Sequence, residues 1–377
     1  MSENIFNGLQ NLSNNKRIKQ LDSLRFFAIF VIMLSHLEFL RESLIGEFYW
    51  TFLHNATFGV DFFFMLSGFG LYYSSYKKEV KIGIKDSFVF AIRKIKKIYL
   101  LYIFSLILCL PFTLGMPNAK LNSVIIKFLL DMTLLQSLFG ATLISHGINA
   151  VCWFLSVLFV CYLFALPMIV FIRKKCANLL VTLFFIFLDI ILITFLSILF
   201  LYFEKDFAMR IARPNPLFDD LFYGSPYIRI WYVFLGMLIS VIYLHLKDMN
   251  INLNVAELCI GGGVLVYFFL RNIVPINMVL LRLIDVLSTA SFLLVFSLGK
   301  GKCSQRLAKS EVFLTAGGKY GMYLYLLHYP VRMNVDFVLK KYTLFVGKYT
   351  FVIEVILIFV LTVFLCIFCK NIFEKSN

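Results

Sequence analysis

The sequence predicts an all-α polytopic membrane protein with about ten transmembrane helices and with both termini in the cytoplasm. Hydrophobic residues make up 61% of the 377 residues and charged residues only 15%, well below the roughly 25% of soluble domains. Apolar runs of about 18 residues or more recur along the chain, and each is long enough to cross a hydrocarbon core of about 30 Å as a helix. Most of the 36 Lys and Arg lie in alternate connecting segments, which the positive-inside rule assigns to the cytoplasm.

The polar leader, residues 1–20, lacks the apolar centre of a signal peptide, so we expect it to stay in the cytoplasm. The membrane domain then covers residues 21–370, and residues 371–377 form a cytoplasmic tail. The expected spans are residues 21–40, 57–76, 98–115, 150–172, 178–202, 227–246, 254–273, 277–298, 320–338 and 348–369. We interpret residues 122–140 as an interfacial or re-entrant helix, because a further span there would place the basic residues 173–175 outside.

Charge and cysteine content exclude several classes of protein. The net charge of +15 could indicate nucleic-acid binding, but the basic residues flank apolar spans and so report topology. We therefore expect membrane lipid and no nucleic acid as a partner. The eight cysteines fall in apolar runs or on the cytoplasmic side, which argues against a disulfide framework. Cys366 and Cys369 form a C-x-x-C pair without a second pair or a nearby His, so we expect no metal site.

The first expected span carries three polar residues on one face. Arg25 and His36 are eleven residues apart, which is about 1,100° around an α-helix, or three turns plus about 20°. Asp22 lies one turn before Arg25. Ionisable residues inside a membrane are costly unless they line a hydrated cavity or are paired, and they mark functional sites by default. The alternative is that Arg25 snorkels to lipid headgroups and His36 makes a packing hydrogen bond; three such residues on one face favour function.

The first expected span and two later segments of the chain resemble the membrane acyltransferase family three. The family begins with a Leu-Asp pair followed by Arg, ten residues and His, which is matched by Leu21, Asp22, Arg25 and His36. Its Gly-Val-Asp-x-Phe-Phe-x-x-Ser-Gly-Phe segment is matched by Gly59, Val60, Asp61, Phe63, Ser67, Gly68 and Phe69. Its late His occurs within GKYGMYLYLLHYPV as His328. The order and spacing of these matches extend over most of the chain.

The resemblance implies an enzyme that moves an acyl group, in our hypothesis acetyl, from cytoplasmic acyl-CoA to a hydroxyl of a cell-surface polysaccharide or its lipid-linked precursor. It implies a bacterial inner or plasma membrane location. The acyl-CoA is a co-substrate, and no permanently bound cofactor is expected. His is the side chain suited to proton transfer near neutral pH, so His36 is expected to act as a general base or to carry the acyl group, and both roles remain open.

Arg25, held by Asp22, is expected to bind the phosphates of the donor together with a basic loop where the family carries an Arg-rich stretch. That loop contains Arg93, Lys94, Lys96 and Lys97. Ordinary positive-inside topology is the alternative explanation for the loop. The residues expected to contact the acceptor are Asp61, Trp153 and His328, for which helix packing is the alternative.

One departure from the family concerns the middle of the chain. The family often has Trp-Ser-Leu-x-x-Glu there, whereas this chain has Trp153 followed by Leu158 at the Glu position. A carboxylate in that role is absent or comes from elsewhere, and the possible sources are Asp189, Asp285 and Glu38.

Two other classes of function remain as alternatives. A transporter for a polysaccharide or small solute would also combine many spans with buried charges. The spacing of Arg25 and His36 and the basic loop favour an enzyme over a transporter. A membrane sensor or anchor is disfavoured because no effector domain is expected in this sequence.

Overall fold

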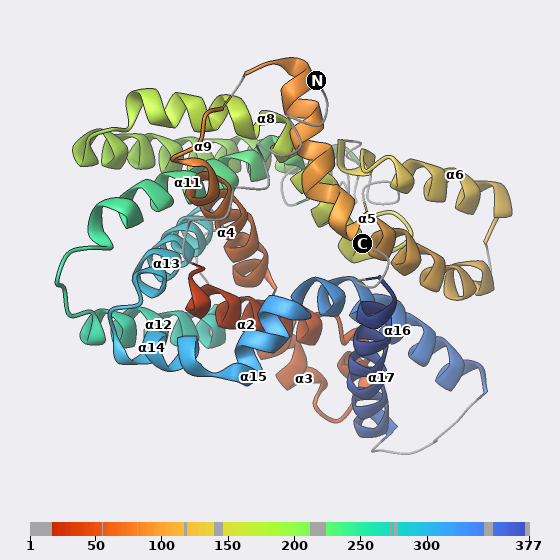
Figure 1. Ribbon diagram of the computed structural model, residues 1–377. Coiled ribbons are helices and arrows are strands. Elements are labelled where there is room, and N and C mark those ends of the chain that lie inside the picture. The colour runs from red at the N-terminus through yellow and green to blue at the C-terminus, as the bar shows by residue number, and fades with distance from the viewer. Residues whose placement is uncertain are drawn as a thin grey trace.

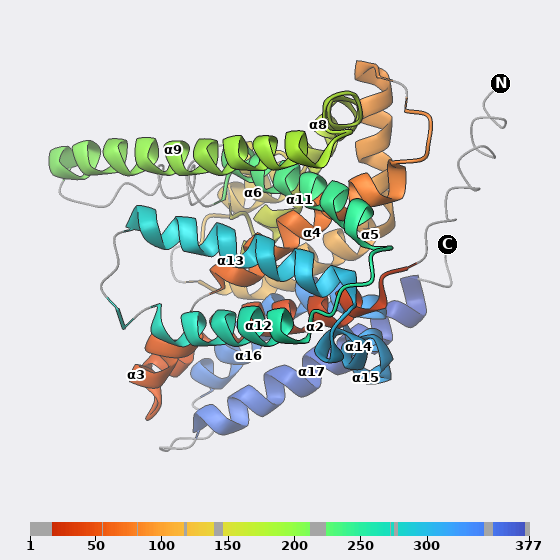
Figure 2. The ribbon, with the colours of Figure 1, turned by 90° about the vertical axis from the view of Figure 1, so that its left-hand side faces the viewer.

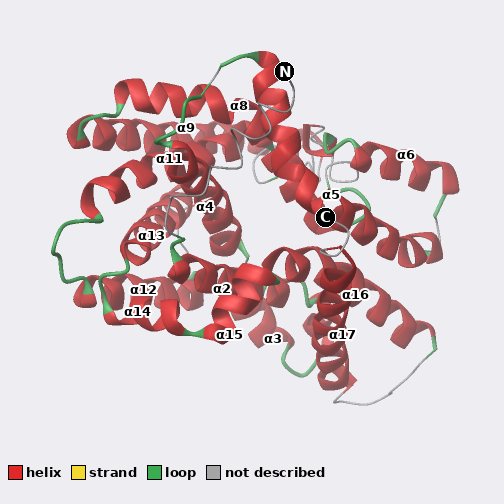
Figure 3. Cartoon of the chain, viewed as in Figure 1, coloured by secondary structure: helices red, strands yellow, loops and turns green. Residues whose placement is uncertain are grey.

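The computed structural model consists of helices joined by loops and turns in the residues that it describes, and no strand occurs in them (Figure 3). These residues are 17–54, 56–80, 82–116, 119–138, 146–211, 224–271, 273–274, 278–342 and 350–373, with the backbone alone described for 200–211 and 278. The long helices are α2 (Lys19–Ser35), α4 (Thr57–Ser75), α5 (Ile84–Gly115), α8 (Trp153–Lys175), α9 (Leu179–Ile211), α11 (Pro226–Leu246), α12 (Asn254–Leu270), α13 (Met278–Leu298), α16 (Gly321–Lys341) and α17 (Thr350–Phe373) (Figure 1).

Shorter helical segments connect the long helices. They are η1 (Glu38–Glu42), α3 (Gly46–Phe48), η2 (Tyr49–Leu53), α6 (Leu121–Met132), η3 (Gln136–Leu138), η4 (Ala150–Cys152), α14 (Lys302–Lys309), α15 (Glu311–Leu314) and η5 (Thr315–Lys319). The 12 residues of α6 span only about 18 Å, which is too short to cross a bilayer. The helix ends at Met132, short of the expected residue 140, and its interfacial or re-entrant position stays a prediction.

Each expected span coincides with a long helix of the described chain, but the helices differ in how well they suit a membrane. Six are both long and apolar enough to span a membrane: α5, α9, α11, α13, α17 and the helix from Ala150 to Lys175 that contains α8. Helices α2 and α12 have only 17 residues each, and α4 and α16 carry buried polar residues. The total of ten spans and the cytoplasmic position of the termini therefore stay predictions. Figure 2 shows α9, α12 and α13 running in roughly one direction, as expected of a membrane bundle.

Two segments differ from the sequence expectation. The first helix ends at Ser35 instead of continuing to residue 40. Its end is fixed locally, because the Ser35 hydroxyl and His36 Nδ1 both donate to the Ile32 carbonyl oxygen, each at 2.8 Å, and such side-chain bonds compete with helical ones. Tyr49 also donates its hydroxyl to the Ser35 carbonyl oxygen at 2.7 Å.

The second difference is the basic loop, which is part of a helix. Helix α5 begins at Ile84, so its first turns include the cations that were expected in a loop. Ala91 and Ile95 are buried at a spacing of four residues, while the cations beside them are exposed. An apolar face with helical period explains why the chain stays helical there.

Close backbone approaches decide which helices are neighbours. Helices α4 and α11 cross where a Cβ on Gly68 would overlap the Val233 carbonyl oxygen, and one on Gly236 would overlap the Met65 carbonyl oxygen. Small residues at such crossings let two backbones meet, which is how helices associate in membranes. Asp61 on α4 also pairs with Arg229 on α11, with exposed side-chain fractions of 0% and 2%.

Helices α2 and α16 run parallel to each other. A Cβ on Gly317, just before α16, would overlap the Asp22 carbonyl oxygen, and one on Gly321 would lie 3.2 Å from Ile29 Cδ1. Further along, His36 and His328 face each other. The end of α17 lies beside the start of α16, because Lys370 Nζ is 5.0 Å from the centre of the Tyr320 ring. The start of α2 and the end of α17 therefore lie at the same end of the bundle.

Candidate functional site

A cavity of about 230 Å³ contains Arg25 near the start of α2 and α16. Its walls come from α2, α4, α8, η5 and α16. They are formed by Arg25, Ile29, Phe63, Leu66, Ser67, Phe154, Leu158, Tyr162, Gly317, Gly318, Gly321, Met322 and Tyr325. Arg25 is the only charged residue in this lining as far as the structure describes it, and most of the other side chains are apolar.

Asp22 holds the Arg25 guanidinium in place through a salt bridge between Arg25 Nη1 and Asp22 Oδ1. The other carboxylate oxygen, Oδ2, accepts from Arg17 Nε at 2.5 Å. Asp22 is 4% exposed in its side chain and Arg25 is 40% exposed. An almost buried carboxylate therefore orients a partly exposed guanidinium, which has further N–H donors besides the one that Asp22 binds.

The segment before α16 closes over Asp22 because it has no side chains at the contact. Gly317 lies against the Asp22 backbone, and a Cβ on Gly318 would be 3.4 Å from Asp22 Cβ. This segment is anchored further back, where Ser23 Oγ donates to the Leu307 carbonyl oxygen of α14 at 2.8 Å. The buried Glu257 carboxylate fixes α14 in turn by accepting from the backbone N–H groups of Gly301, Cys303 and Ser304, which is favourable at a helix N-terminus.

His36 lies at the other end of α2 and meets His328 of α16. His328 Nε2 is 3.4 Å from His36 Nδ1, and the two ring centres are 5.3 Å apart. Each imidazole is also bound to the carbonyl four residues earlier on its own helix. His36 Nδ1 is 2.8 Å from the Ile32 oxygen and His328 Nδ1 is 3.0 Å from the Leu324 oxygen.

These contacts define the tautomers. Because carbonyl oxygens only accept hydrogen bonds, both Nδ1 atoms carry hydrogen. His328 Nε2 then has a lone pair that accepts from His36 Nδ1–H. The same N–H also donates to the Ile32 carbonyl oxygen. His36 Nε2 is left as an unprotonated nitrogen with no hydrogen-bond partner among the described residues. A base oriented by a third group in this way is the arrangement that proton transfer requires.

An aromatic ring separates the Arg25 cavity from the histidine pair. Tyr325 lines the cavity, and its ring centre is 6.1 Å from that of His328. The histidines themselves line a tight space with Met33, Leu37, Arg332, Ile358 and Phe359. The cavity and the base are therefore adjacent along the α2–α16 contact, with Arg25 at one end and His36 about 16 Å further along the helix axis.

Sequence reasoning missed Arg332, which lies beside the histidine pair. Its Nη2 donates to Glu38 Oε2 at 3.1 Å, and its buried Nε has no hydrogen-bond partner in the described structure. The signal was present in the sequence, because Arg332 follows His328 by four residues and so shares its helix face. Of the three carboxylates considered as replacements for the mid-chain Glu, Glu38 is the one paired next to His36.

The other two carboxylates lie in different surroundings. Asp285 pairs with Arg271 at 2.9 Å and Arg282 at 3.7 Å. Asp189 is 3% exposed, and both of its oxygens lack a partner in the described part of the chain. Leu158, at the family's Glu position, lines the Arg25 cavity. A carboxylate at that position would therefore share the cavity with Arg25.

The remaining predicted residues lie apart from the histidines. Asp61 is fully buried in its pair with Arg229. Trp153 is 6% exposed and packs against Phe64 and Phe154. The cations of α5, which do not line the Arg25 cavity, are exposed: Arg93, Lys94, Lys96 and Lys97. The structure thus brings together His36 and His328, with Arg25 and Asp22 at the far end of the same helix contact.

Comparison with known proteins gives the identity of the fold. A family profile described as an acyltransferase domain matches residues 18–370, nearly the whole chain. No curated protein and no solved structure matches the chain. The matched range includes the Arg25 cavity and the histidine pair. The chain therefore belongs to the acyltransferase 3 family, and with its apolar helices it is a membrane acyltransferase.

Proposed function

We propose that this protein transfers an acetyl group from cytoplasmic acetyl-CoA to a hydroxyl of a cell-surface polysaccharide or its lipid-linked precursor, in a bacterial inner or plasma membrane with both termini in the cytoplasm. The contact between His36 and His328, next to the Arg25 cavity, is the observation that carries the proposal. It combines a cation for an anionic donor with an oriented imidazole for a hydroxyl acceptor.

In this mechanism His36 acts as a general base. Its Nε2 removes the proton of the acceptor hydroxyl while the oxygen attacks the thioester carbonyl. The tetrahedral intermediate collapses, the C–S bond breaks, and the thiolate of coenzyme A takes up the proton from His36. While His36 is doubly protonated, the Ile32 carbonyl and His328 Nε2 both accept from its Nδ1–H. This pair of acceptors favours the cationic state that the base passes through.

Arg332 supports the same step. Its guanidinium lies beside both imidazoles and has a buried N–H without an acceptor in the described residues. A donor of that kind stabilises the oxyanion that develops on the thioester carbonyl. At the other end of the helix contact, Arg25 binds a phosphate of the donor, which Asp22 prepares by fixing the guanidinium.

The test uses the purified protein in proteoliposomes with radiolabelled acetyl-CoA and an envelope glycan from cells that lack the gene. The His36→Ala variant should lose label transfer by about 100-fold or more, because a general base contributes about 10²- to 10⁴-fold. Its insertion and its affinity for coenzyme A should remain those of the wild type. His245→Ala is the matched control, since His245 Nδ1 bonds the carbonyl four residues earlier on α11 in the same way.

Two results would overturn the proposal. Transfer at the wild-type rate by His36→Ala would remove this residue from the chemistry. Label that accumulates on the wild-type protein before acceptor is added, and then passes to the glycan, would show that a residue of the protein carries the acyl group, and would overturn direct transfer with His36 as a base.

A further inference from the structure

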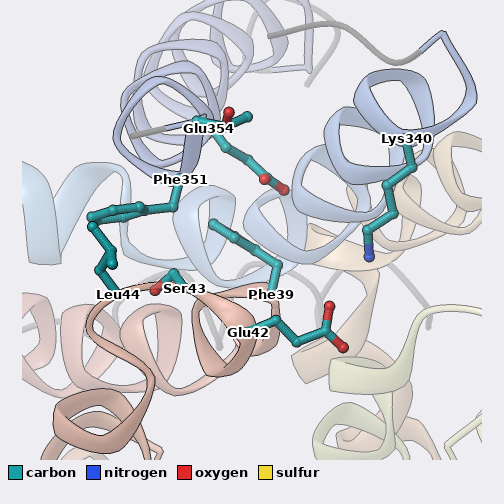
Figure 4. Close-up of a pocket in the computed structure, with 8 residues that line it drawn as sticks. Phe39, Glu42, Ser43, Leu44, Lys340, Phe351 and Glu354 are labelled. Atoms are coloured by element: carbon teal, nitrogen blue, oxygen red, sulfur yellow. The ribbon is translucent and has the colours of Figure 1, made fainter. Parts of the chain in front are cut away.

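A second cavity, of about 390 Å³, lies at the end of the α2–α16 contact opposite to Arg25. It is open to the surface and is bordered by η1, the end of α16 and the start of α17. Figure 4 shows Glu354 and Lys340 extending into the space between these elements, with Phe39 and Phe351 beside it. The lining consists of Phe39, Glu42, Ser43, Leu44, Lys340, Thr350, Phe351 and Glu354. Its volume is in the range of about 300 to 1,000 Å³ that small-molecule sites occupy.

This cavity adjoins the histidine pair. Glu354 precedes Ile358 by four residues on α17, and Ile358 lines the space around His36 and His328. Phe39 follows Leu37, which lines that same space, by two residues. About 6 Å along the axis of α17, roughly one turn, therefore separates Glu354 in the wall of this cavity from Ile358 in the wall of the space around the two histidines.

Glu354 lies in the wall of this cavity, and one of its carboxyl oxygens accepts no hydrogen bond from the described residues. The residue is 7% exposed, and its Oε1 has no hydrogen-bond partner in the described part of the chain. A buried carboxyl oxygen without a donor is costly, and a ligand with O–H or N–H groups would satisfy it. The exposed Glu42 offers a second carboxylate at the rim.

The charges of the cavity favour ligands that are not anionic. Lys340 is the only cation among the described residues that line it, and Lys340 Nζ lies 2.9 Å from Asp336 Oδ1, so its charge is already matched. The exposed Glu42 carboxylate then leaves the rim of the cavity with excess negative charge. Two aromatic rings, Phe39 and Phe351, provide apolar faces on which the C–H face of a sugar ring can rest.

We propose that this cavity is the acceptor subsite and that it takes a neutral or amino sugar in preference to an acidic one. The assignment rests on the proposed acyl transfer for the identity of its ligand. Donor and acceptor then enter from opposite ends of the α2–α16 contact and meet at His36. The carboxyl groups of Glu354 and Glu42 accept from sugar hydroxyl or ammonium groups, and the exposed Glu42 carboxylate repels the carboxylate of a uronic acid.

The test measures binding to the full-length protein in detergent, without donor, by titration calorimetry or saturation-transfer NMR. The probes are the methyl glycosides of glucose, glucosamine and glucuronic acid. The wild type should bind the first two at least about tenfold more tightly than the third. Glu354→Gln, which keeps the shape of the side chain, should weaken binding of the glucosamine glycoside by about tenfold, equivalent to about 1.4 kcal/mol. Glu42→Gln should narrow the discrimination against the glucuronide.

Glu311→Gln, on the exposed start of α15, is the matched control and should bind all three probes like the wild type. Equal binding of the glucuronide by the wild type, absence of binding of any glycoside, or wild-type binding by both cavity variants would overturn the assignment. Because donor is omitted, the two proposals fail separately. Selective sugar binding without acyl transfer would support the acceptor subsite and refute the proposed acyl transfer. Acyl transfer with an unchanged KM for the acceptor in both variants would refute the acceptor subsite alone.

Discussion

Removal of His328 tests whether the imidazole pair acts as a unit. In the resting protein the bond from His36 Nδ1 to His328 Nε2 is long, at 3.4 Å, and joins two neutral groups. Such a bond contributes about 0.5–1.5 kcal/mol, whereas one from a charged donor contributes about 1.5–3 kcal/mol. The difference of about 1–1.5 kcal/mol is available only while His36 is protonated, in the transition state. His328→Ala should therefore lower kcat by about tenfold and leave the KM for the donor close to that of the wild type.

The assay is steady-state release of coenzyme A in proteoliposomes at saturating acceptor. His328→Gln provides a conservative variant, because its side-chain carbonyl oxygen is able to accept from His36 Nδ1–H, and it should retain more activity than His328→Ala. His245→Ala loses an equivalent bond to a backbone carbonyl on α11 and should keep wild-type kcat. Thermal unfolding of each variant separates loss of the fold from loss of chemistry.

Wild-type kcat in His328→Ala would show that His328 has only a packing role and would refute the imidazole pair. Equal loss of activity in His328→Ala and His328→Gln would refute it as well, because the loss would not depend on an acceptor for the His36 N–H.

Three further predictions concern other parts of the molecule. Arg25→Gln should raise the KM for acetyl-CoA by about tenfold or more with little change in kcat, because it removes a charged group that donates hydrogen bonds to a phosphate of coenzyme A. A wild-type KM in a titration with acetyl-CoA would refute the role of Arg25 in binding that phosphate. Gly68→Ala should lower the unfolding temperature, because overpacking against the Val233 carbonyl costs about 1–3 kcal/mol. The control Gly70→Ala, with no atom within 4 Å of its Cβ, should leave that temperature unchanged, and equal effects of the two variants would contradict the crossing. For Asp131 on α6, burial raises the pKa to about 7, opposed in part by the Ile148 N–H and by Lys127. The contribution of this carboxyl group to stability is then complete below its unfolded pKa of about 3.9 and is lost as pH rises through about 7. The unfolding temperature of the wild type should therefore fall over that pH range. Asp131→Asn should make the unfolding temperature depend less on pH.

Features that depend on neighbours along the chain were accessible from the sequence. Hydropathy located the long helices, since each apolar run must be helical to satisfy its backbone in lipid. The 3.6-residue period placed Asp22, Arg25 and His36 on one side of α2, and the structure has all three facing the segment from η5 through α16. Local signals were less reliable at the helix ends. The side-chain bonds of Ser35 and His36 to Ile32 end α2 early, and the apolar face of α5 extends that helix through the basic residues.

Contacts between distant segments were not accessible in the same way. His36 and His328 are 292 positions apart, and Asp61 and Arg229 are 168 positions apart. Which helices meet is decided by shape, through close approaches at Gly68, Gly236 and Gly317 that hydropathy and periodicity do not encode. A helical membrane protein with a cationic and an imidazole group on one helix was therefore predictable from the order of its residues. That a second imidazole orients the first became visible in the packed helices alone, because the relation depends on α2 and α16 lying side by side.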